Sequence, residues 1–322
     1  VPVESQALVF SQTSFQGPLI NIHNPRALYF NDTVAVGWVR GGKFVEVAVQ
    51  DPRQGVIFYA LDQQDSATPQ FKHNEECLAC HLSWDTLGVP GFFVMSMYPL
   101  PDDKNAYATG FTSDHRSPFS ERWGGWYVTG NTGGAAHMGN VPVMPADQGK
   151  SKLADPLKPL ASLDGLFDSN GYLSPYSDVV ALMVLAHQTH MTNLITRVGW
   201  EERVQSQNPS RKGAERVESA AEDLVNYMLF VDEASPAAAI RGSSGFAEQF
   251  AAKGPRDVKG RSLRQFDLEK RLFRYPCSYL IYSEAFNALP MRVKEMIYAR
   301  MWRILSGQDR RERYSVLSLP DR

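Results

Sequence analysis

The sequence predicts an α+β fold, in which a β-rich N-terminal lobe is followed by a mainly α-helical C-terminal lobe. Between residues 34 and 61, three short segments with strand-like patterning are separated by turn sequences. Beyond residue 177, apolar residues recur with the helical period instead. The intervening stretch 146–176 is rich in Pro, Asp, Gly and Ser. We therefore expect a lobe over 1–145, a linker over 146–176 and a second lobe over 177–322.

The strands of the first lobe follow from alternation and turn chemistry. Residues 34–39 and 44–49 alternate around the sequence Arg-Gly-Gly-Lys, which predicts a β-hairpin. Residues 56–61 predict a third strand, so a meander is expected. Shorter strands are expected at 91–100, 106–111 and 125–129, before a glycine-rich loop over 130–140.

The helices of the second lobe follow from apolar periodicity and capping residues. The strongest pattern covers 178–197. The other helices are expected at 214–230, 247–253, 263–274 and 284–305.

Composition and charge narrow the class of protein. Of the residues, 43% are hydrophobic and 21% charged, as in ordinary globular proteins. No apolar run approaches the ~20 residues that span a bilayer. The net charge is −2, yet residues 251–322 carry 16 Lys and Arg against 8 Asp and Glu. This asymmetry indicates either a basic face that steers an acidic partner or an internal contact between the lobes. The basic residues are scattered, so no nucleic-acid partner is expected.

The sequence Cys77-Leu78-Ala79-Cys80-His81 is the most specific motif in the chain. Its spacing places both thiols on one face of a short helix, for which Asn74 is a suitable N-cap. A zinc site would need a second Cys or His pair, and the third cysteine, Cys277, stands alone. A redox pair of the thioredoxin type would need a βαβ setting. The pattern C-x-x-C-H instead indicates covalent attachment of haem.

These five residues resemble the haem-attachment signature of c-type cytochromes. The resemblance implies one covalent haem c, held by thioethers from Cys77 and Cys80 with His81 as proximal iron ligand. It also implies a periplasmic or otherwise extracytoplasmic protein, because such haem is attached outside the cytoplasm. The chain begins without a basic segment or an apolar stretch, as a mature chain would after removal of an export signal. Class I cytochromes c are shorter and helical, so neither the fold nor the second ligand is implied.

The second iron ligand has several candidates. We favour His137, in the glycine-rich loop, where small neighbours would let an imidazole approach the ring. Met138 beside it, and His187 and His190 on one stripe of the 178–197 helix, are alternatives. A buried, hydrogen-bonded histidine without iron is the commonest explanation for the last two.

Arginine is the best partner for haem propionates, and Arg116 and Arg122 flank a turn ahead of an aromatic segment. We expect these two residues to bind the propionates. Alternatively, they pair with Asp114 and Glu121 at the surface.

The function expected from these features is single-electron transfer between protein partners by an exported monohaem protein. One alternative is a peroxidase-like enzyme with an open distal site, in which His115 and Arg116 would act over the iron. Another is a haem sensor or a subunit of a larger redox complex that docks through the helical lobe.

Overall fold

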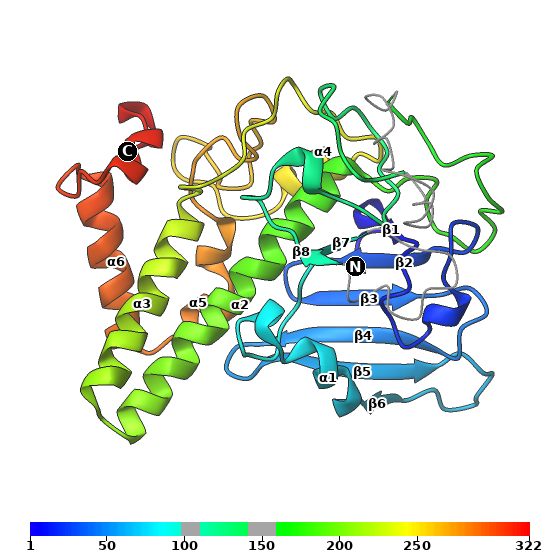
Figure 1. Cartoon of the computed structure of the whole chain (residues 1–322), viewed down its shortest axis with the longest axis horizontal. Helices are drawn as coiled ribbons and strands as arrows, with labels where there is room; N and C mark the ends of the chain where they lie inside the picture. The colour runs from blue at the N-terminus through cyan, green and yellow to red at the C-terminus, as the bar shows by residue number, and fades with distance from the viewer. Residues whose placement is uncertain (98–109, 141–158) are drawn as a thin grey trace, which may run out of the picture.

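The computed structural model describes residues 1–97, 110–140 and 159–322. An antiparallel sheet forms the N-terminal part and helices form the C-terminal part, which confirms the α+β class (Figure 1). The division into lobes at 146–176 stays a prediction, and part of that linker, 146–158, lies outside the described residues.

The sheet has six strands in sequence order, each antiparallel to the next. The strands are β1 (Ala7–Val9), β2 (Arg26–Phe30), β3 (Val34–Trp38), β4 (Phe44–Asp51), β5 (Gly55–Asp62) and β6 (Phe71–His73). The predicted meander corresponds to β3, β4 and β5. The other three strands were not predicted, because they lack strict alternation: β1 is buried throughout, β6 is exposed throughout, and β2 ends in two consecutive buried residues.

The later predicted strands are only partly correct. Within the described residues, the 91–100 segment contains only β7 (Met95–Ser96), which pairs with β8 (Phe111–Thr112). Most of the 106–111 prediction, and the end of 91–100, lie outside the described residues. Residues 125–129 form isolated bridges instead of a strand, one of them between Val9 and Trp126. Gly125 has a φ of 85°, which an extended strand does not accommodate.

Six α-helices and a set of short 3-10 turns are present in the described residues. The α-helices are α1 (Leu78–His81), α2 (Val179–Gln207), α3 (Arg211–Met228), α4 (Phe246–Ala252), α5 (Glu284–Asn287) and α6 (Met291–Leu305), with α1 being a single turn. The 3-10 turns are Val3–Ser5, Gly17–Leu19, Glu75–Cys77, Trp84–Thr86, Phe119–Glu121, Tyr279–Tyr282, Glu312–Val316 and Leu319–Asp321.

Two helix predictions need correction. Residues 263–274 form turns and not a helix: the Asp267 carboxylate accepts hydrogen bonds from the backbone of Glu269 and Lys270, which offers the chain an alternative to helix. Residues 284–305 form two helices, α5 and α6, because Pro290 stands between them and becomes the N-cap of α6.

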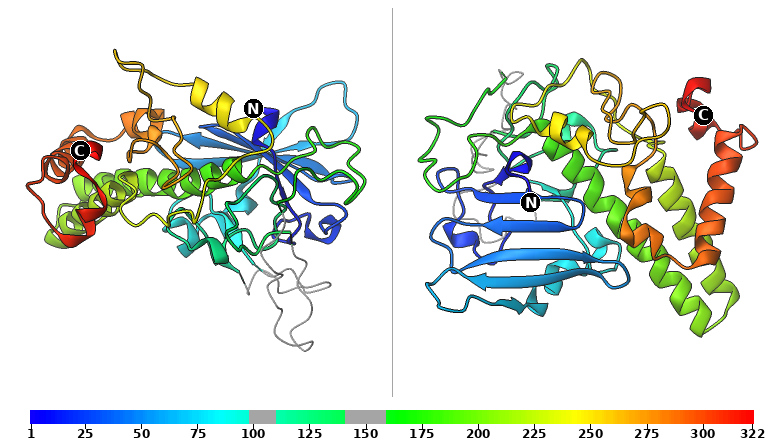
Figure 2. Two further views of the ribbon diagram at one scale, coloured as in Figure 1. Left: turned by 90° about the horizontal axis from the view of Figure 1, so that it is seen from above. Right: turned by 180° about the vertical axis from the view of Figure 1, so that it is seen from behind.

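Helix α2 is the centre of the molecule (Figures 1 and 2). Asp178 caps its first turn by accepting from the backbone N–H groups of Val180 and Ala181. Its first half is almost wholly buried, with the sheet on one side and α3 on another. None of the helices in the described residues is long and apolar enough to cross a membrane.

Candidate cofactor site

The Cys-Leu-Ala-Cys-His motif lies on the predicted short helix. The 3-10 turn over Glu75–Cys77 runs directly into α1. Asn74 is the N-cap, and its side chain accepts a hydrogen bond of 3.1 Å from the backbone N–H of Glu76. Cys77 is half-buried and Cys80 is exposed, and both thiols are free. The motif therefore lies partly at the surface, and its two thiols are not bonded to each other.

The imidazole of His81 is held in one orientation by Gly91. His81 Nδ1 lies 2.8 Å from the carbonyl oxygen of Gly91, and the backbone N–H of Gly91 donates to the carbonyl of His81 at 2.9 Å. A carbonyl oxygen can only accept, so Nδ1 carries the proton and Nε2 keeps its lone pair. This is the second-sphere hydrogen bond that metal-binding histidines commonly make.

Helix α2 fixes the position of Gly91. The Asn193 side chain accepts from the backbone N–H of Phe92 at 3.1 Å and donates to its carbonyl at 2.6 Å. A Cβ at Gly91 would overlap the Asn193 carboxamide. The absence of a side chain at Gly91 therefore allows α2 to approach the segment that orients His81.

Aromatic rings surround the imidazole. The ring of Phe58, on β5, lies 4.7 Å from that of His81, and the ring of Phe93 lies 5.2 Å away. Burial is the largest influence on His81 and lowers its pKa. The neutral ring, which is the form that binds iron, is therefore favoured.

All three motif side chains line a cavity of about 360 Å³ between α1, the sheet and α2. This volume lies within the ~300–1,000 Å³ range of ligand pockets. The walls are mostly apolar. They are formed by Gln12, Thr13, Ser14, Phe15, Arg26, Leu28, Tyr29, Phe30, Ala35, Gly37, Glu46, Val47, Ala48, Phe58, Tyr59, Phe92, Phe93, Val94, Trp126, Leu185 and Thr189, together with Cys77, Cys80 and His81.

The sheet side of this cavity is formed by small residues between large ones. Phe30, Ala35, Ala48 and Phe58 are direct cross-strand neighbours on four successive strands, and all four line the cavity. Two alanines at the centre leave room that the flanking phenylalanines enclose. Gly37 extends the same surface on β3. The residues present thus fit a flat apolar group such as a porphyrin.

One charged pair lies on this otherwise apolar surface. Arg26 on β2 and Glu46 on β4 form an ion pair across β3, and about a fifth of each side chain is exposed. Ser14 Oγ donates to Glu46 Oε1 at 2.8 Å. A Cβ at Gly37 would lie 2.7 Å from Arg26 Nη2 and 2.8 Å from Glu46 Oε2, so the pair occupies the space above that glycine. Sequence reasoning missed both residues, because only the strand pairing brings them together.

His137 and Met138 are buried away from the motif. The His137 ring packs edge-on against Trp123 at 5.4 Å, and its Nδ1 accepts from the backbone N–H of Gly139 at 3.1 Å. Burial lowers the pKa of His137 to about 4. Met138 Sδ lies 3.8 Å from Ser96 Oγ. Neither residue lines the cavity, so the assignment of His137 to iron stays a prediction without a supporting contact.

Arg116 and Arg122 also lie elsewhere. Arg116 makes a bidentate pair with Asp114, with Nη2 2.6 Å from Oδ2, which is the alternative considered from the sequence. Arg122 is buried and donates to the carbonyls of Ser117 and His115 at 2.8 Å each. Neither guanidinium lines the cavity, and the propionate role proposed for them gains no support from these contacts.

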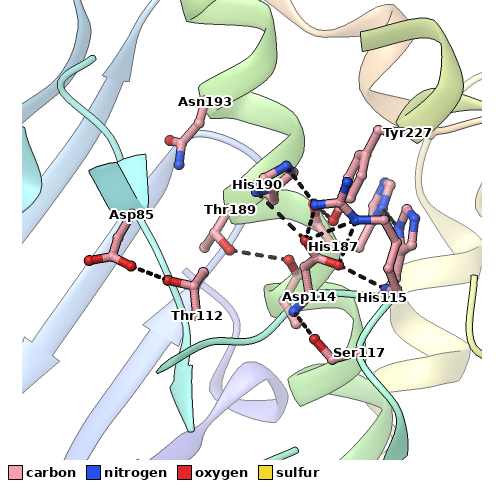
Figure 3. A network of polar contacts seen from close by, with 12 residues as sticks. Asp85, Thr112, Asp114, His115, Ser117, His187, Thr189, His190, Asn193 and Tyr227 are labelled. Atoms are coloured by element: carbon pink, nitrogen blue, oxygen red, sulfur yellow. Dashed lines mark hydrogen bonds and ion pairs between the residues drawn. The ribbon is translucent and has the colours of Figure 1, made fainter. Parts of the chain in front are cut away.

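His115 and His187 meet in a second buried cluster beside α2 (Figure 3). Their Nδ1 atoms are 2.8 Å apart, and His187 Nε2 lies 2.8 Å from Ser278 Oγ. Both rings stack on Tyr227, with centroids 3.9 and 5.3 Å away. Burial lowers the pKa of both histidines, that of His187 to about 3. These are hydrogen-bonded core histidines, the commonest explanation considered for His187.

His190 belongs to the same cluster. Its Nε2 lies 3.1 Å from Arg116 Nη2, and its Nδ1 lies 3.7 Å from Asp114 Oδ2. Burial lowers its pKa to about 4. His190, His115 and Arg116 are thus brought together with Asp114, but outside the cavity that holds His81. The peroxidase-like arrangement of His115 and Arg116 over the iron is not supported by these positions.

Comparison with protein-family models, with curated proteins and with solved structures gives no match. In the described ranges 1–97, 110–140 and 159–322, no three or more His, Cys, Asp or Glu side chains form a group that could hold a metal ion. The motif also stands beside an antiparallel sheet, whereas class I cytochromes c are helical. The interpretation of the chain as a c-type cytochrome is therefore corrected, since nothing positively identifies that family.

Covalent haem is a separate question. A porphyrin supplies four ligands to its iron, so the protein needs to contribute only the axial ones. A group of three protein donors is not required for it.

Proposed function

We propose that this protein carries one haem, attached through thioethers from Cys77 and Cys80, with His81 as an axial ligand, and passes single electrons between protein partners. The observation that carries the proposal is the position of His81: its Nδ1 is bound to Gly91 while the ring lines an apolar cavity together with both thiols. When bound, haem supplies a one-electron iron couple.

The residues of this chain would each have a defined task. Cys77 and Cys80 would tether the cofactor against loss, and His81 would bind iron in the tautomer that Gly91 imposes. The apolar walls would exclude water from the ring. A dry, rigid setting limits reorganisation when the charge of the iron changes, which favours fast transfer.

The exposed side of the motif supports exchange with a protein partner. Cys80 is exposed, and the next residues include Leu82 at 47% and Trp84 at 96% exposure. Trp84 therefore points to solvent and does not line the cavity. Aromatic side chains are enriched at protein interfaces, and Trp84 is exposed close to Cys80. We propose that a redox partner docks on Leu82 and Trp84, next to the cofactor edge at Cys80.

The basic C-terminal stretch, residues 251–322, supports the docking proposal less than the exposed residues beside the motif do. Several of its arginines pair within the chain: Arg292 Nη1 lies 2.6 Å from Glu202 Oε2, and Arg313 Nη2 lies 2.9 Å from Asp232 Oδ2. Both pairs lie within the helical C-terminal part, so these arginines are occupied there and do not form a free basic face.

The proposed haem attachment also implies a cellular location. Haem is attached to C-x-x-C-H motifs outside the cytoplasm, so a periplasmic or otherwise extracytoplasmic protein is proposed.

The test uses protein produced in a host able to attach haem. Absorption spectra of the ferric and ferrous forms, with and without carbon monoxide, would be combined with voltammetry on the same sample. We expect a haem spectrum and a reversible one-electron wave. His81→Gln should change the spectrum and shift the wave, while His23→Gln, an exposed histidine outside the cavity, should change neither.

A spectrum insensitive to carbon monoxide would support an electron carrier with both axial positions filled. A spectrum that shifts with carbon monoxide, together with turnover of peroxide, would replace electron transfer by catalysis at the same haem. Protein without any haem band would contradict the proposal as a whole.

A further inference from the structure

The Arg26 guanidinium lies in a mostly apolar cavity, and not all of its N–H groups have a hydrogen-bond partner. Its Nη2 pairs with Glu46, but its Nε is buried and has no hydrogen-bond partner among the described residues. A buried N–H of a charged group is costly to leave unpaired. Since Arg26 lines the same cavity as His81, a ligand in that cavity can satisfy it.

The surroundings of Arg26 hold it in place. Glu46 is fixed by Ser14, and Gly37 leaves the space in which the guanidinium lies. Leu28 and Ala35 provide apolar surface nearby. A planar fork of donors oriented in this way is suited to a carboxylate or another small anion.

We infer that Arg26, positioned by Glu46 over Gly37, is the anion-recognition residue of the cavity. The inference rests on the proposed haem site and deepens it. Two sources provide the same chemistry: a propionate of the haem itself, or a small anion that enters the cavity. Arg26 takes the role that the sequence suggested for Arg116 and Arg122.

Two readouts on the haem-loaded protein test the inference and separate the sources. The first is the reduction potential without added ligand. The second is the affinity of the ferric protein for fluoride, from a spectral titration. The variants are Arg26→Gln, which removes the charge, and Arg26→Lys, which keeps the charge but loses the fork. Arg40→Gln is the control, because Arg40 pairs with Asp168 at 3.1 Å and does not line the cavity.

Removing a positive charge beside the haem favours the oxidised form, so Arg26→Gln should lower the reduction potential. If the anion is a propionate, the potential falls and fluoride affinity is unchanged or absent throughout. If the anion is exogenous, fluoride affinity also falls by about tenfold or more. Arg26→Lys should lie between parent and Arg26→Gln, and Arg40→Gln should match the parent.

Gly37→Ala provides an independent check, because its Cβ would displace the guanidinium without changing any charge. It should shift the same readouts in the same direction as Arg26→Lys. If the Arg26 variants hold haem and match the parent in both readouts, the inference is overturned while the haem proposal stands. If no variant and no parent protein holds haem, the proposed function itself fails.

Discussion

The Asn193 side chain of α2 binds both polar backbone groups of Phe92: it accepts from the N–H at 3.1 Å and donates to the carbonyl oxygen at 2.6 Å. Through the adjacent Gly91, this contact links the central helix to the imidazole of His81. The orientation of the proposed iron ligand thus depends on a residue 112 positions away in the chain.

The Asn193 contact should contribute to stability even in the protein without cofactor. Asn193→Ala removes both hydrogen bonds and leaves two backbone groups of Phe92 without partners. We expect the free energy of unfolding to fall by about 1–3 kcal/mol, measured by urea denaturation. Asn193→Asp keeps an acceptor for the Phe92 N–H but places a buried carboxylate oxygen against the Phe92 carbonyl oxygen, so it should cost at least as much as Asn193→Ala. No measurable loss for Asn193→Ala would contradict a stabilising contact at Phe92.

Gly91 and Asn193 should be coupled. Gly91→Ala places a Cβ where the Asn193 carboxamide lies, so it should destabilise the parent protein. In an Asn193→Ala background that overlap is gone, and the same change should cost less. A double-mutant cycle by urea denaturation should therefore give a coupling of about 1 kcal/mol or more. Additive effects would contradict the close approach of α2 to Gly91.

The buried His137 should make stability depend on pH. Its pKa is lowered to about 4 by burial, against ~6.5 in an unfolded chain. Between these values the unfolded chain binds more protons than the folded one, so the free energy of unfolding rises with pH through this window. The contribution of His137 reaches its full value above ~6.5. His137→Gln should flatten the profile by up to about 3 kcal/mol between pH 6.5 and 4. Parallel profiles of the free energy of unfolding against pH for parent and variant would contradict this role of His137.

Trp84 should matter for a protein partner and not for the haem. Trp84→Ala should slow reduction by a small redox protein several-fold while leaving the absorption spectrum and reduction by dithionite unchanged. Trp302→Ala is the matched control, because Trp302 is 67% exposed on α6, away from the motif. Equal rates for all three proteins would place the docking surface elsewhere.

The sequence was most informative where the signal is local. The helix around Cys77 and His81, its cap at Asn74, and the meander β3–β5 all depend on residues close together in the chain, and each was predicted. The misassigned helix at 263–274 has helical apolar spacing, but the Asp267 side chain stabilises turns there.

The rest of the candidate site depends on pairing between distant segments. Arg26 and Glu46 stand on different strands and meet only because both flank Gly37 in the sheet. Asn193 reaches Phe92 only because α2 packs beside the sheet. These contacts cannot be predicted from spacing along the chain. For that reason the sequence favoured Arg116 and Arg122 over Arg26 as anion-binding residues.

Covalent haem attachment is the central claim, and intact mass under denaturing conditions tests it most directly. Protein matured in a host able to attach haem would be compared with the Cys77→Ala/Cys80→Ala double variant and with Cys277→Ala, a partly buried cysteine outside the cavity. The account predicts one haem mass retained on the parent and on Cys277→Ala, and none on the double variant. A parent protein with no added mass, or haem that dissociates on denaturation, would contradict it.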